Sequence, residues 1–206
     1  MGLLACLFLG FGVATVGSIT PSFLNMTVVK FSLNRGRTAA FYLIAGFATV
    51  LFFQANLGAY LSNVLMENSE YIIAIQKLGT AILLLLSINF FRLHFTSQKR
   101  VKKVETDKSQ AYLHGVGMSL LNTFAIPFYF TTLSLLIALE YFKYSIENSV
   151  FFSIGSTLGS FCLYALYAIV ASKIEHKLAF IATKMNLVLA GITGIVGLGN
   201  LIYLLK

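Results

Sequence analysis

Gly17-Ser-Ile-Thr-Pro21-Ser-Phe-Leu-Asn25 places a proline and several polar side chains inside a long apolar run of the chain. A second such stretch, Asn122-Thr-Phe-Ala-Ile-Pro127, lies inside another apolar run of the second half. Their two prolines are the only prolines of the sequence. Because proline lacks a backbone donor and clashes with the preceding turn, each stretch predicts a helix that is kinked or broken at its proline.

The composition identifies the surroundings of these helices. Of the 206 residues, 58% are hydrophobic and 11% are charged, and the mean hydropathy is +0.84. Soluble domains carry about 25% charged residues, so the chain is not a soluble enzyme, a disordered segment or a disulfide scaffold. The net charge of +8 would suggest nucleic acid as a partner of a soluble domain. In so apolar a chain it predicts an integral membrane protein whose partner is the lipid bilayer, and no nucleic acid.

Six apolar runs are long enough to cross a bilayer, which takes roughly 20 residues. Backbone groups in hydrocarbon must be paired within their own segment, so we expect helices and an all-α bundle. The chain then forms one transmembrane domain, residues 1–206. The predicted spans are Leu3–Val29, Ala39–Met66, Tyr71–Phe91, Ala111–Leu139, Val150–Ala171 and Met185–Leu205.

The positive residues predict the orientation of the spans. Twelve of the fifteen lysines and arginines lie in the first, third and fifth connections, whereas the second and fourth connections hold only Lys143. The positive-inside rule therefore places the odd connections in the cytoplasm and both termini outside, in a cytoplasmic (inner) membrane crossed several times.

The spans divide into two halves of three, residues 1–93 and 111–206, on either side of a basic cytoplasmic loop at 94–110. An odd number of spans in each half inserts the halves in opposite orientations, as in many secondary transporters. Gly10 and Gly12 recur as Gly115 and Gly117, 105 residues later. We therefore expect an inverted repeat in which the first and fourth helices are broken.

Broken helices at matching positions of two halves point to a transport site. No Asp or Glu lies within a predicted span, so the ligands must be neutral groups, and half-helix N-termini favour a carboxylate. A zwitterion suits this arrangement. Gln54 serves either as a ligand or as an interhelical hydrogen-bonding residue, and His114 as a proton relay or an interfacial residue. The candidate substrate-binding residues are Thr20, Pro21, Ser22, Asn25, Gln54, Asn122, Thr123 and Pro127.

The chain resembles the LysE/RhtB-type amino-acid exporters. Thr20-Pro21-Ser22 near the end of the first span is followed by the basic turn Ser32-Leu-Asn-Arg-Gly-Arg37, and Gly115 with Asn122 is spaced like the start of that family's Asn-Pro-Lys element. Ser22 stands where the family usually has glycine, and Thr123-Phe124 replaces Pro-Lys. The resemblance implies the export of amino acids.

These observations predict a secondary exporter of amino acids or similar small zwitterions, driven by the proton gradient or the membrane potential. It is not an enzyme, and no cofactor or metal site is expected. A non-transporting scaffold or assembly subunit is one alternative. A transmembrane thiol–disulfide carrier is another, but Cys6 and Cys162 do not flank the prolines, where such a carrier needs thiols. Gly155-Ser-Thr-Leu-Gly159 suits packing within the monomer or in a homodimer.

Overall fold

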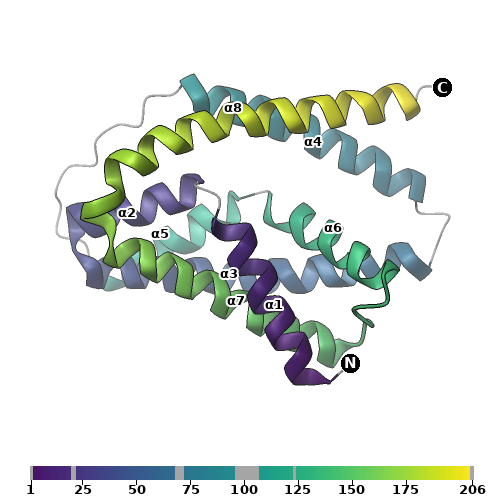
Figure 1. The fold of residues 1–206 in the computed structure, drawn as a ribbon, viewed down its shortest axis with the longest axis horizontal. Helices are drawn as coiled ribbons and strands as arrows, with labels where there is room; N and C mark the ends of the chain where they lie inside the picture. The colour runs from purple at the N-terminus through teal and green to yellow at the C-terminus, as the bar shows by residue number, and fades with distance from the viewer. Residues whose placement is uncertain (1, 20–21, 68–71, 96–106, 123, 205–206) are drawn as a thin grey trace.

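A computed structural model describes residues 2–19, 22–67, 72–95, 107–122 and 124–204, apart from the side chains of 72–76, 78, 86, 93–94, 175–186 and 189. The all-α prediction is confirmed, because the described residues form helices and no strand (Figure 1). The helices are α1 (Leu3–Ile19), α2 (Phe23–Arg35), α3 (Arg37–Glu67), α4 (Ile72–Phe95), α5 (Lys108–Leu120), α6 (Ala125–Ala138), α7 (Ile146–Ile169) and α8 (Ala171–Leu204).

Among the described residues, α3 and α7 are each long and apolar enough to cross a membrane. The pairs α1 with α2 and α5 with α6 meet the same requirement when each pair is taken as one bent span, which makes up to four candidate spans. Shorter apolar stretches lie within α4 at Gly79–Arg92 and within α8 at Ala190–Leu204. The chain is therefore a multi-pass membrane protein.

The first predicted span consists of two helices with a bend between them. α1 ends at Ile19 and α2 begins at Phe23, with a bend of 79° between them. Pro21 itself lies outside the described residues. Ser22 holds the extended conformation of a residue that precedes a helix.

The fourth predicted span bends by 58° between Leu120 and Ala125, about one turn before Pro127, the residue at which a break was predicted. Pro127 is the third residue of α6. The first four amides of a helix have no partner within it, so proline costs little at this position. The break thus precedes Pro127.

The prediction of a loop between Ala171 and Met185 is wrong. α8 begins at Ala171, directly after the end of α7, and continues without a break to Leu204. Between these residues the sequence has neither proline nor glycine until Gly191, and it is rich in Ala, Lys, Leu and Ile. No residue therefore stops the helix, and the basic Lys173 lies on it.

Polar residues determine where two of the helices start. Ser109 donates to the carboxylate of Asp107 before α5, and this hydrogen bond, followed by those from first-turn amides, lowers the pKa of Asp107. Ser145 caps α7 by accepting from the amide of Asn148 at 3.1 Å. Asp107 and Ser145 both lie in predicted connections, and Ser145 is the one of the two that makes a side-chain capping hydrogen bond.

Most helix contacts join the first half of the sequence to the second. α1 runs along α7, and α3 runs along α5, α6 and α7. α4 pairs with α8, and Figure 1 shows these two lying side by side along one face of the other helices. α2 contacts α3, α7 and α8. Each half is thus completed by helices of the other.

Glycines make two of these crossings close. Gly10 of α1 lies against the backbone of Phe152, and Gly155 of α7 lies against the backbone of Leu7. In the second crossing, Gly115 of α5 and Gly46 of α3 each lie against backbone atoms of the opposite helix. A side chain at any of these glycines would overlap main-chain atoms, which cannot move without shifting a helix.

Gly10→Ala tests the first crossing, with Gly12→Ala as a matched control in the same helix. A methyl group at Gly10 overlaps the carbonyl of Phe152, whereas one at Gly12 meets nothing within 4 Å. We expect Gly10→Ala to destabilise the protein by about 1–3 kcal/mol through overpacking, and Gly12→Ala to leave it unchanged or slightly more stable. Thermal unfolding in detergent measures both, and equal Tm values for the two variants would contradict the close crossing.

Candidate functional site

The break between α1 and α2 is held by side chains that pair the last carbonyls of α1. The side-chain amide of Asn25 donates to the carbonyl of Ser18 at 2.9 Å, and the phenol of Tyr167 donates to that of Ile19 at 3.0 Å. The other end of the Asn25 side chain accepts from the hydroxyl of Ser22 at 2.5 Å. Asn25 is fully buried. These side chains pair carbonyls that the end of the helix leaves without a partner in α1.

The break between α5 and α6 is held in the same way from α3. The side-chain Nε2 of Gln54 donates to the carbonyl of Ser119 at 3.1 Å. The backbone N–H of Asn122 donates to the same carbonyl at 3.0 Å. The hydroxyl of Ser119 donates in turn to the carbonyl of Phe47 on α3. The Oε1 of Gln54 is buried and has no partner among the described residues.

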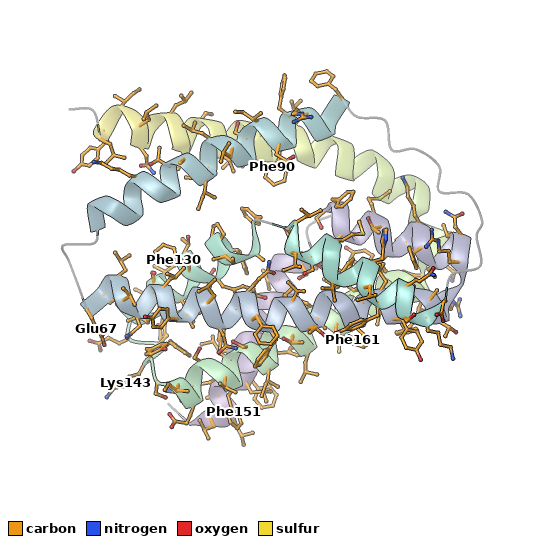
Figure 2. All side chains as sticks on the ribbon, turned by 180° about the vertical axis from the view of Figure 1, so that it is seen from behind. Glu67, Phe90, Phe130, Lys143, Phe151 and Phe161 are labelled. Carbon is orange, nitrogen blue, oxygen red and sulfur yellow. The ribbon has the colours of Figure 1, made fainter. Side chains whose placement is uncertain are left out.

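The two breaks lie close together. The ring of Phe128, in the first turn and a half of α6, lies against Gly17 of α1, so that a methyl group at Gly17 would overlap it. Phe128 also lies 6.4 Å from Phe124, whose ring is 6.3 Å from that of Phe90. Figure 2 shows Phe90 on α4, on the side of that helix facing the other helices. Aromatic rings therefore form the apolar wall beside both breaks.

A row of hydroxyl groups on α7 faces this region, and the candidate residues deduced from the sequence omit it. The Ser160 hydroxyl lies 3.1 Å from that of Ser18, beside the first break, and Ser156 donates to the carbonyl of Gly10 at 3.2 Å. The phenol of Tyr129 on α6 interacts with both of these α7 serines. The sequence signal is the spacing of three and four residues, typical of one helix face, in Ser149, Ser153, Ser156, Ser160 and Tyr164.

The structure brings together only some of the predicted site residues. Ser22 and Asn25 lie at the first break, and Gln54 and Asn122 at the second. Pro127 is half-buried beside Phe128. The remaining residues of the prediction, Thr20, Pro21 and Thr123, lie outside the described residues.

His114 lies apart from these side chains. Its exposed ring is 5.9 Å from that of Phe31, and its described contacts do not include residues that flank a break. The two cysteines are also placed elsewhere, with Cys6 buried in the first turn of α1 and Cys162 exposed on α7. Within the described part of the chain, no His, Cys, Asp or Glu residues group as a metal would require.

The chemistry available at the breaks is that of neutral hydrogen-bonding groups. None of the seven acidic residues of the chain lies within the broken helices α1, α2, α5 and α6. Carboxamides and hydroxyls accept from an ammonium group and donate to a carboxylate. The N-termini of α2 and α6, both at the breaks, add the positive end of a helix dipole. Such a set offers hydrogen bonds to groups of either charge.

Two broken helices that meet inside a helical membrane bundle, with neutral polar groups at the breaks, are the arrangement of a membrane translocator. The family comparison agrees, because the model of the family described as LysE type translocator matches residues 13–204. The chain belongs to the LysE type translocator family, a family of transporters. Comparison with curated proteins and with solved structures gives no match.

Asn25→Ala tests whether the first break depends on its carboxamide. The variant leaves the carbonyl of Ser18 and the hydroxyl of Ser22 without this partner in a buried site, so we expect a loss of about 1–3 kcal/mol and a lower Tm. Thr27→Ala is the matched control, since the Thr27 hydroxyl bonds only the carbonyl of Phe23 in its own helix. If both variants unfold at the wild-type temperature, Asn25 does not hold the break.

Proposed function

We propose that the protein is a secondary transporter that exports amino acids or similar small zwitterions, driven by the proton gradient or the membrane potential. One observation carries the proposal: the two helix breaks lie beside each other and are both held by neutral side-chain amides, those of Asn25 and Gln54. Breaking a helix inside the bilayer is costly, and translocators use breaks to present backbone groups to a substrate.

Six spans in two inverted halves are part of this proposal. α1 with α2 and α5 with α6 would be the broken spans, and α4 and α8 would supply the third span of each half. The packing supports it, because the crossing of α1 on α7 has a counterpart in the crossing of α5 on α3. Close glycine contacts occur in both crossings. The two crossings correspond if α5 takes the place of α1 and α3 takes the place of α7. An inverted repeat would relate the helices in this way.

The proposed orientation has the second and fourth connections outside and the termini outside, in the cytoplasmic membrane. Figure 2 supports this in one respect, since Glu67 at the end of α3 and Lys143 before α7 lie at the same end of the molecule. The opposite end carries Arg35, Arg37 and Lys108, which suit contact with an anionic cytoplasmic leaflet.

Neutral ligands favour a zwitterion over a cation as the substrate. Thr20, Pro21, Ser22, Asn25, Gln54, Asn122, Thr123 and Pro127 are the residues we propose for binding, and none of them carries a charge. The carboxylate would lie near the N-termini of α2 and α6, and the ammonium group near oxygen acceptors such as Oε1 of Gln54. An additional side-chain charge would have no counter-charge, and burying it would cost several kcal/mol.

Transport by inverted membrane vesicles tests the proposal. With an imposed proton gradient, we expect uptake of one or more neutral amino acids and much slower uptake of lysine and arginine. Asn122→Ala should lower the rate at least tenfold, because it removes a carboxamide from the second break, and Pro21→Ala should do so by reshaping the first. Asn200→Ala, an exposed position on α8, is the control.

Two results would count against the proposal. Absence of flux for every protein amino acid would favour the scaffold or assembly role. If Asn122→Ala and Pro21→Ala reach the membrane in wild-type amounts and transport at the wild-type rate, the protein is a transporter but the helix breaks are not its substrate-binding site.

Labelling of single cysteines tests the orientation. In a background of Cys6→Ala and Cys162→Ala, we expect Lys143→Cys to react with an impermeant maleimide added to intact cells, and Lys108→Cys to react only in inverted vesicles. Lys108 lies at the start of α5, and Lys143 lies between α6 and α7. The reverse pattern would invert the topology without affecting the location of the site.

A further inference from the structure

Two side chains in the described structure are more than nine-tenths buried and have a polar atom without a hydrogen-bond partner there. Oε1 of Gln54 is one of them, and its residue already belongs to the proposed site. The other is Oγ of Ser153, whose residue is 0% exposed. No proposed ligand lies on α7, so the Ser153 hydroxyl needs an explanation of its own.

Serine and threonine hydroxyls in apolar helices usually bond the carbonyl four residues earlier, and several here do. Thr15, Thr49 and Thr157 each donate to the carbonyl of the residue four positions before. The hydroxyl of Ser153 has no such bond. The Ser153 hydroxyl therefore departs from the pairing that is usual for serine in an apolar helix.

The contacts of the serines next to Ser153 on α7 show which helices this face packs against. Ser149, one turn earlier, donates to Oδ1 of Asn56 on α3 at 3.1 Å, and Ser156, one turn later, donates to the carbonyl of Gly10 on α1. Ser153 lies between them on the same helix face. The adjacent Phe152 ring contacts the ring of Tyr129 on α6, 6.2 Å away. Ser153 therefore lies where α7 meets α1, α3 and α6.

The hydroxyl row continues from Ser153 to the first break. Ser160, which contacts Ser18, is two turns away along α7, and Ser149 lies one turn away in the opposite direction, toward Lys143. A polar atom buried without a partner in hydrocarbon surroundings is costly, and one that a ligand satisfies is not. The row thus runs from the first break toward the end of the bundle at which Glu67 and Lys143 lie, and Ser153 is its member whose hydroxyl has no partner among the described residues.

We propose that the hydroxyl face of α7 lines the translocation route, and that Ser153 hydrogen-bonds the ammonium or carboxylate group of the zwitterion as it passes between the breaks and that end of the bundle. This inference rests on the proposed function. It adds α7 to the substrate-contacting elements and gives the unpartnered hydroxyl its partner. Ser149, Ser156 and Ser160 hold the face in place through their bonds to α3 and α1.

Ser153→Ala separates a transport role from a structural one. Removing an unsatisfied buried hydroxyl raises the stability of the empty protein, so we expect a higher Tm in detergent. Removing a substrate contact lowers transport, so we expect Vmax/KM for neutral amino acids in proteoliposome counterflow to fall about tenfold, the equivalent of about 1.4 kcal/mol. A variant that is more stable and less active is the signature of a ligand residue.

Two controls on α7 complete the experiment. Ser156→Ala should lower the Tm, because it removes the bond to the carbonyl of Gly10, and Thr157→Ala should leave transport unchanged, because its hydroxyl bonds only its own helix. Counterflow is measured with each protein amino acid as a radiolabelled probe.

The outcomes distinguish this inference from the proposed function. If the wild type transports amino acids and Ser153→Ala has the same Vmax/KM, the inference is overturned and the proposed transport function stands. The Ser153 hydroxyl would then bond a resident water rather than the substrate. Absence of wild-type transport of any amino acid would overturn both.

Discussion

A carboxamide donating to the last carbonyl of a broken helix is the interaction on which the rest of the structure depends. Asn25 does this for Ser18 at the end of α1, and Gln54 does it for Ser119 at the end of α5. Without Asn25 the carbonyl of Ser18 would lose this partner, and without Gln54 the carbonyl of Ser119 would keep only the backbone amide of Asn122. Under-paired main-chain acceptors in an apolar bundle favour continuous helices over broken ones. The breaks exist because each is covered by an amide side chain from another element.

Of the two amides, Gln54 reaches its carbonyl across a contact between the two halves of the sequence. Gln54 is on α3, and its partner is on α5, a helix of the other half. That contact needs α3 and α5 at backbone distance, which Gly46 and Gly115 allow. The glycine crossings and the polar breaks are therefore parts of one arrangement, in which close packing brings donors to the main-chain groups that the breaks release.

The sequence predicts the class of this fold well, because the bilayer permits few solutions. Apolar run lengths predict the long helices, and the two bent helix pairs fall within the two predicted spans that contain a proline. Residue detail was less accessible. The fourth span breaks before Pro127 because proline fits the first turn of a new helix, and α8 extends through an expected basic loop because a lysine-bearing stretch without glycine or proline stays helical.

The residues of the candidate site also differ in how far the sequence alone reveals them. Asn25 and Gln54 stand out in sequence as amides in apolar helices, whereas Ser149, Ser153, Ser156 and Ser160 are individually common residues whose shared face matters only once α7 is packed. A serine hydroxyl in a membrane helix is usually satisfied by its own backbone. Only the three-dimensional contacts separate the serines whose hydroxyls bond other helices, such as Ser156, from Ser153, whose hydroxyl bonds none of the described residues.

The neutrality of the site that we propose constrains how the proposed transport would be driven. A zwitterion carries no net charge, so the membrane potential does no work on it directly and acts only through an ion that moves with or against it. None of the acidic residues lies within α1, α2 or α6, and the exposed His114 contacts Phe31 rather than the breaks. A coupled proton would therefore have to act through groups outside the breaks, by changing how the two halves pack. The glycine crossings are the surfaces at which such a change of packing would alter both breaks at once.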